Sequence, residues 1–86
     1  MLGFKFKQLA SVIESVLFEE WLYGNENWIP DYKIKLLALK RGVVAKEDDF
    51  RRVASDLARL GRIRKFPGKS LFKCVYCKEK EVVAFG

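Results

Sequence analysis

At Gly61 the chain changes from one repeat to another, and this change limits the folds open to its second half. Before Gly61, apolar residues recur every three to four positions, as they do on one face of a helix. After it, residues 62–66 and 71–77 resemble two strands, with Pro67-Gly68 supplying a turn between them. The sequence therefore predicts a helix that ends at Gly61 and leads directly into a β-hairpin. The expected buried stripe of that helix is Phe50, Val53, Ala54, Leu57 and Leu60.

An amphipathic helix is also predicted at the start of the chain, over residues 7–23. It should end at Gly24, because the polar residues that follow favour turns. Residues 28–29 are expected to form a very short strand before the next helix. The apolar stripe of this first helix is Leu9, Val12, Ile13, Val16, Leu17 and Trp21.

A second helix is predicted from Pro30-Asp31 to Gly42, with Ile34 the weakest fit to its apolar pattern. Acidic residues at positions 47–49 suit the N-terminus of the third helix, where the helix dipole favours negative charge. A chain of 86 residues can bury one small core, so we expect one α+β domain over residues 1–86. Residues 78–86 form a C-terminal extension that could add a strand, bind a partner or fray.

Positive charge is concentrated in the second half of the chain. Between Arg51 and Lys73 there are eight Arg and Lys residues and one acid, Asp56, so this segment holds a charge of +7. The whole chain has a formal net charge of +6, so the remainder is close to neutral. Cations clustered on a helix and an adjoining hairpin suit two neighbouring parts of a duplex, which makes nucleic-acid binding the leading hypothesis.

The predicted order of helix, short strand, helix, helix and hairpin resembles the winged helix-turn-helix family over residues 7–76. The closest likeness is the segment Leu57-Ala-Arg-Leu-Gly-Arg-Ile-Arg-Lys-Phe66, which runs from the third helix into the wing. Its phrase Leu-x-x-Leu-Gly-x-Ile is similar to that of many small transcription regulators, archaeal and archaeal-viral ones included. The resemblance implies a winged helix of three helices followed by a β-hairpin wing.

The resemblance further implies that the third helix enters the major groove of double-stranded DNA and that the wing lies on phosphates or the minor groove. Wing cations should then set much of the salt dependence of binding. The expected DNA-binding residues of the helix are Arg51, Arg52, Ser55 and Arg59. Those on and around the wing are Arg62, Arg64, Lys65, Lys69 and Lys73.

Acids on or near the same helix face oppose this interpretation, because each one near a phosphate costs affinity unless it pairs with a cation. Helical spacing allows Asp48 to pair with Arg52, and Asp56 to pair with Arg52 or Arg59. Asp49 lies beside them. A solvated helix with several ion pairs is therefore the competing interpretation of this segment.

Cys74 and Cys77 have the spacing of half a structural zinc site, but a full site needs four ligands and the chain has no His. Two subunits could share one zinc or form a disulfide between them, and a bend in the strand would allow a bond within one chain. The alternative is that both are ordinary strand residues, with Cys74 buried beside Phe72 and Tyr76. No other cofactor is expected.

The aromatic residues are numerous for so short a chain, with seven Phe, three Tyr and two Trp. Phe18, Trp21 and Phe50 should be core residues, because they lie on or beside the helical stripes. Phe4, Phe6 and Trp28 are expected to be partly exposed and could form a dimer contact. A homodimer is therefore predicted.

The function expected from these features is double-stranded DNA binding by a cytoplasmic transcription regulator. The alternative is a winged helix that binds a protein or RNA within a larger transcription, replication or viral assembly. Membrane insertion and a small-molecule substrate are not expected, and an enzyme is disfavoured because His, a Gly-rich phosphate loop and an isolated acid pair are missing. Abundant charged residues and the lack of Thr hint at a thermophilic source.

Overall fold

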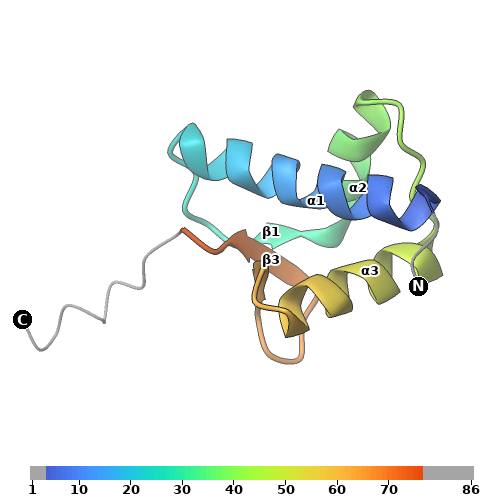
Figure 1. Cartoon of the computed structure of the whole chain (residues 1–86). Coiled ribbons are helices and arrows are strands. Elements are labelled where there is room, and N and C mark those ends of the chain that lie inside the picture. Colours follow the sequence, from blue (N-terminus) through green and yellow to red (C-terminus); the bar gives the residue numbers. More distant parts are fainter. Residues whose placement is uncertain (1–3, 77–86) are drawn as a thin grey trace, which may run out of the picture.

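The computed structural model describes residues 4–76, with side chains from Phe6 onward, and Figure 1 shows their arrangement. Cys77, the extension 78–86 and the side chain of Phe4 lie outside this part of the chain. The elements in order are α1 (Phe4–Leu22), β1 (Ile29–Pro30), α2 (Asp31–Lys40), α3 (Glu47–Arg59), β2 (Ile63–Lys65) and β3 (Leu71–Cys74). Residues 4–76 thus form an α+β fold, as predicted, although α1 begins three residues earlier than the pattern indicated.

The change of period at Gly61 has a clear structural basis. Gly61 has a φ of 78°, in the left-handed region, where residues with a Cβ atom are strained. Its N–H donates to the carbonyl of Ala58 (3.0 Å), and the N–H of Arg62 donates to the carbonyl of Leu57 (2.9 Å). These two bonds are those of a Schellman motif, which satisfies the last carbonyls of the helix. The chain therefore leaves α3 in a fixed direction and reaches β2 within three residues.

The sheet is antiparallel, and β3 lies in its centre, between β1 and β2. The predicted hairpin is confirmed, with Ile63 opposite Cys74 and Lys65 opposite Phe72. The short strand predicted near residue 28 is also present, and it pairs with β3 through Ile29 and Phe72. The element order and this topology are compatible with a winged helix.

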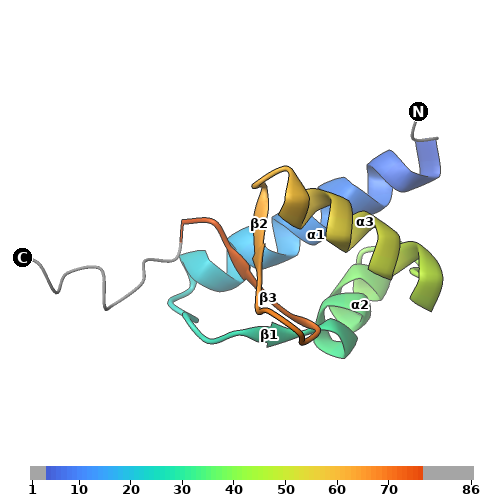
Figure 2. The ribbon, with the colours of Figure 1, turned by 90° about the horizontal axis from the view of Figure 1, so that it is seen from below.

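The core lies where α1 and α3 pack against one side of the sheet, and α1 also covers α2. Figure 1 shows α1 above β1 and β3, and Figure 2 shows α3 beside the hairpin. Phe50 of α3 and Phe72 of β3 meet edge to face there, with ring centroids 5.9 Å apart. The buried residues are Leu9, Ile13, Val16, Leu17, Ile29, Ile34, Ala38, Val43, Phe50, Val53, Ala54, Leu57, Ile63, Phe72 and Cys74.

Two residues predicted to be buried are not. Leu60 is 65% exposed, because α3 ends at Arg59 and the chain turns away from the core after it. Phe18 is 40% exposed and rests against Trp21 at the edge of the core. Ile34, the weakest residue in the predicted pattern of α2, is fully buried, since it and Ala38 lie one turn apart on the side that faces the core.

None of the helices in residues 4–76 combines the length and the apolar character needed to cross a bilayer.

Candidate nucleic-acid interface

The exposed face of α3 carries the four residues predicted for it. Arg51, Arg52, Ser55 and Arg59 are all exposed, because Phe50, Val53, Ala54 and Leu57 turn the opposite face of the helix into the core. The guanidinium side chains of Arg51 and Arg59 each keep 70% of their surface in solvent. This face is therefore available to a partner.

Ion pairs on α3 differ in part from those predicted. Asp56 accepts a hydrogen bond from Arg59 at 2.7 Å, which is one of the two expected pairings. Within residues 4–76 Arg52 makes no ion pair, so its predicted pairing with Asp48 is wrong. The partner of Arg51 is Glu47, one turn earlier, at 3.2 Å.

Glu47 joins α3 to α2. Its carboxylate accepts a hydrogen bond from Lys35 at 2.5 Å as well as the one from Arg51. The bonds from Lys35 and then Arg51 hold the pKa of Glu47 below its ordinary value of 4.5, because both favour the charged form. Glu47 is thus ionised at neutral pH and partly neutralises Arg51.

The charge of α3 depends on where the helix begins. The structure starts it at Glu47, so it contains three Arg residues and four acids and has a net charge of −1. The positive segment identified in the sequence began at Arg51 and left out the three acids of the first turn. Most of the excess positive charge therefore lies on the hairpin.

The hairpin contains cations and no acids. Residues 62–73 hold five Arg and Lys residues, and the first Asp or Glu after Asp56 is Glu79. The two strands distribute these cations over two sides of the sheet. Lys65 shares a side with Phe72, toward α3, whereas Arg64 and Lys73 are paired on the opposite side. Lys69 is exposed in the turn between the strands.

A narrow groove joins α3 to the hairpin. Arg51, Ser55 and the acid Glu47 line it from the helix, Lys65 and Ser70 line it from the hairpin, and Asp31 lines it from the start of α2. Its volume of about 30 Å³ has room for about one water molecule, so it is a seam and not a ligand pocket. The seam brings predicted residues of the helix and of the wing onto one continuous surface. Ser70 was not among the predicted residues, because a lone Ser in a turn carries no sequence signal.

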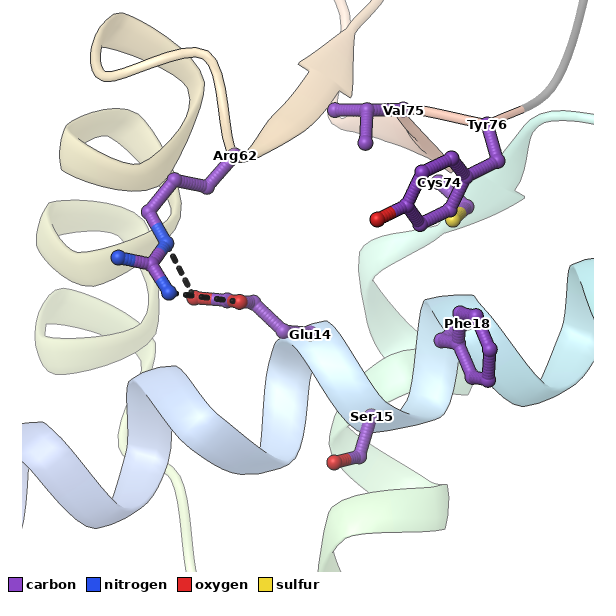
Figure 3. Close-up of a pocket in the computed structure, with 7 residues that line it drawn as sticks. All are labelled: Glu14, Ser15, Phe18, Arg62, Cys74, Val75 and Tyr76. Atoms are coloured by element: carbon purple, nitrogen blue, oxygen red, sulfur yellow. Dashed lines mark hydrogen bonds and ion pairs between the residues drawn. The ribbon is translucent and has the colours of Figure 1, made fainter.

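Arg62 does not lie with the other wing cations. Its guanidinium makes a two-pronged ion pair with Glu14 of α1, with Nε 2.9 Å from Oε2 and Nη2 3.2 Å from Oε1. Figure 3 shows this pair at one side of a surface hollow between α1 and the end of β3. Arg62 thus connects the start of the hairpin to α1. Arg62 precedes β2 and points toward the first helix, so the structure does not bring it together with the other cations predicted for the wing.

The hollow in Figure 3 has a volume of about 390 Å³ and also contains the thiol of Cys74. Cys74 is buried and free, next to Phe72 on the core side of β3, in agreement with the strand interpretation. Tyr76, predicted beside it, is exposed. The part of the chain described here contains no cluster of three or more His, Cys, Asp or Glu side chains that could hold a metal ion. Cys77 lies outside it, so the shared zinc or disulfide stays a prediction.

Comparison of the chain with protein-family models, with curated proteins and with solved structures found no match. The class that the fold itself defines is a small α+β domain of three helices and a three-stranded antiparallel sheet, within residues 4–76.

Proposed function

We propose that this protein is a winged-helix regulator that binds double-stranded DNA, with the β2–β3 hairpin as its main phosphate-binding element. The observation that carries the proposal is the acid-free run of cations in residues 62–73, set beside the exposed face of α3. Each cation that neutralises a phosphate releases counterions, so such a surface binds DNA in a strongly salt-dependent way. Lys65 lines the seam beside α3 and Lys69 is exposed in the turn of the same hairpin, so we assign these two cations to the duplex.

In this proposal α3 contributes base contacts and the hairpin contributes most of the affinity. Arg51, Arg52 and Arg59 have the fork geometry that pairs with guanine edges, and Ser55 is small enough to allow close approach. The ion pairs of Arg51 and Arg59 are exposed and weak, so a guanine or a phosphate can replace the acid.

A homodimer is part of the proposal, because paired half-sites usually require two copies of a winged helix or related domain. A cluster of three rings offers a contact surface away from the hairpin turn. Trp21 lies 5.6 Å from Phe18 and 5.4 Å from Tyr76, centroid to centroid, and both of these neighbours are exposed. Analytical ultracentrifugation of the wild type and of Phe18→Ser should give a dimer and a monomer, respectively.

The test of DNA binding is a fluorescence-anisotropy titration with random duplex DNA at several salt concentrations. For a Lys65→Ala/Lys69→Ala variant, the slope of log affinity against log salt should fall by about 2, since each lost phosphate contact removes about 0.9. The matched control is Lys7→Ala/Lys40→Ala, which removes the same charge from exposed sites on α1 and α2. Equal losses in the two variants would show that only total charge matters.

Absence of duplex binding at low salt by a folded protein would remove the proposal. The acids and ion pairs of α3 would then favour the alternative, a winged helix that binds another protein or RNA.

A further inference from the structure

The sheet has a second side, which faces away from the core. Its register places Arg64 opposite Lys73 and Pro30 opposite Leu71. Continuing the same ladders by one residue brings Trp28 opposite Lys73, and Phe66 opposite Leu71, whose carbonyl accepts the N–H of Phe66 at 2.9 Å. We call this surface the outer sheet face, and its members are Trp28, Pro30, Arg64, Phe66, Leu71 and Lys73.

Two aromatic rings and two cations meet on the outer sheet face. The rings of Trp28 and Phe66 are perpendicular, with centroids 5.2 Å apart, although they come from opposite flanks of β3. The ammonium group of Lys73 lies 4.9 Å from the centroid of the Trp28 ring, within cation–π distance. All six residues keep part of their surface in solvent, and no acid is among them.

This composition differs from that of the core side of the same strands. The core side carries Ile29, Ile63, Phe72 and Cys74, all buried. An outer face of an antiparallel sheet is ordinarily polar, because it meets water. Here it holds a Trp and a Phe together with cations, which is the combination that binds single-stranded nucleic acids: rings stack with unpaired bases and cations contact the backbone.

We propose that the outer sheet face binds single-stranded DNA, with Trp28 and Phe66 stacking on unpaired bases and Arg64 and Lys73 contacting phosphates. A duplex does not suit this surface, because its bases are already stacked on each other and do not present their faces. The cations disfavour an apolar protein segment as the occupant of this face. An acidic segment would pair with the cations but would leave the two aromatic rings without a partner. The charge and the rings together fit a single strand.

This inference goes beyond the proposed duplex binding and does not depend on it. Lys65 turns toward α3, whereas its neighbour Arg64 lies on the outer sheet face, so the two surfaces use opposite sides of one hairpin. A protein with both surfaces could hold a junction between duplex and opened DNA. The two activities can be removed separately.

The first experiment uses the fact that the chain has only two Trp residues, Trp21 and Trp28. Trp21 belongs to the ring cluster with Phe18 and Tyr76, so a Trp21→Phe variant leaves Trp28 as the single fluorescent reporter of the outer sheet face. Titration with a 12-nucleotide oligothymidine should quench its emission as the strand stacks on the ring. The reciprocal variant, Trp28→Phe, keeps only Trp21, and its emission should not change.

The second experiment measures affinity by anisotropy of labelled oligothymidine and of duplex DNA. Trp28→Ala and Phe66→Ala should each weaken binding of the single strand about tenfold, the loss expected for one stacked base. Both should leave duplex binding within twofold of the wild type, while Lys65→Ala/Lys69→Ala should weaken duplex binding. Circular dichroism checks that each variant is folded, and the quenching experiment needs neither Ala variant.

The inference is overturned if Trp28 emission is unchanged by oligothymidine, or if folded Trp28→Ala and Phe66→Ala variants bind it as well as the wild type. Quenching by oligouridine alone would also overturn it, since the occupant would then be RNA. Quenching without any duplex binding would support this inference and remove the proposed duplex function. Duplex binding without quenching would overturn this inference and support the proposed duplex function.

Discussion

The exposed face of α3 and the β2–β3 hairpin both display cations, but the neighbours of those cations differ. On α3, Arg51 and Arg59 each lie within hydrogen-bonding distance of an acid on the same helix. On the hairpin, Lys73 lies over an aromatic ring, and the Nζ of Lys65 is 3.4 Å from the backbone carbonyl of Phe66. The number of cations alone would rank the two regions as similar. Their neighbours indicate that Lys65 and Lys73 present more uncompensated charge to an anionic partner than Arg51 and Arg59 do, whereas Arg62, at the start of the hairpin, is paired with Glu14.

The face of α3 and the hairpin both rest on the core contact between Phe50 and Phe72. Removing one of these two rings should change the free energy of unfolding more than any other substitution proposed below. Phe72→Ala deletes the ring that lies beneath the hairpin and against Phe50 of α3. We expect a loss of about 3–5 kcal/mol in the free energy of unfolding, which is most or all of the stability of so small a domain. Urea denaturation followed by circular dichroism measures it. Leu36→Ala, at a half-exposed site on α2, should stay within about 0.5 kcal/mol of the wild type.

A loss below 1 kcal/mol for Phe72→Ala would mean that the hairpin folds independently of α3. The helix α3 and the hairpin would then be two separately folding units and not two sides of one core.

The junction between the regions is the next most sensitive position. Gly61→Ala introduces a Cβ atom at a φ of 78°, where no neighbouring atom lies within 4 Å, so its cost comes from the backbone conformation alone. We expect a loss of about 1–2 kcal/mol in the free energy of unfolding. Gly61→Asn should lose less, because Asn tolerates left-handed dihedrals. Equal losses for Ala and Asn would place the cause in contacts and not in the dihedral angle.

The difference in charge between α3 and the hairpin can be tested by removing acids from α3. A Glu47→Gln/Asp56→Asn variant frees Arg51 and Arg59 from their partners, so duplex affinity at low salt should rise about two- to fivefold. Anisotropy titration measures this change. As a control, Glu26→Gln removes an exposed acid from the loop after α1 and should have a smaller effect. No gain in the double variant would show that α3 stays away from the DNA.

The smallest expected effect is the pH dependence that Glu47 adds to stability. Its pKa is lower in the folded protein than the ordinary 4.5, because Lys35 and Arg51 bond to the charged form. A lowered folded-state pKa stabilises the fold above the unfolded pKa, and this stabilisation is lost as the pH falls through the folded value. The stability difference between the wild type and Glu47→Gln should therefore be present at pH 6 and shrink steadily below pH 4.5. If the stability difference does not change with pH, it comes from helix capping by the side chain and not from the charge of Glu47.

Local patterns predicted the elements well, because their causes are local. The termination of α3 just before Gly61 and the turn at Gly68 both depend on the positive φ angles of these glycines, which the sequence itself reveals. The prediction that Leu60 is buried is wrong. The apolar periodicity continues through Leu60, but α3 ends one residue before it, at Arg59. Contacts between distant segments could not be predicted at all. The pair of Arg62 with Glu14 joins residues 48 positions apart, and Trp28 meets Phe66 only because β1 lies beside β3.

The candidate site was predicted in composition but not in its distribution. Eight of the nine residues assigned to DNA from sequence lie on α3 or on the α3 side, turn or outer side of the hairpin: Arg51, Arg52, Ser55, Arg59, Arg64, Lys65, Lys69 and Lys73. Arg64 shares the outer side with Lys73, whereas Arg62 turns to α1. The two sides of the hairpin became distinguishable only when the strand register was known, because a shift of one residue would exchange them.

The sheet order also decides how copies of this protein can meet. Its central strand, β3, is flanked by two very short strands, and both edges therefore offer few free backbone groups. One edge contains Pro30, which has no N–H to donate, and the other carries Arg64 and Lys65. Such edges resist pairing with a further strand. Copies crowded together at high concentration should thus stay separate folded units instead of joining into a continuous sheet and aggregating.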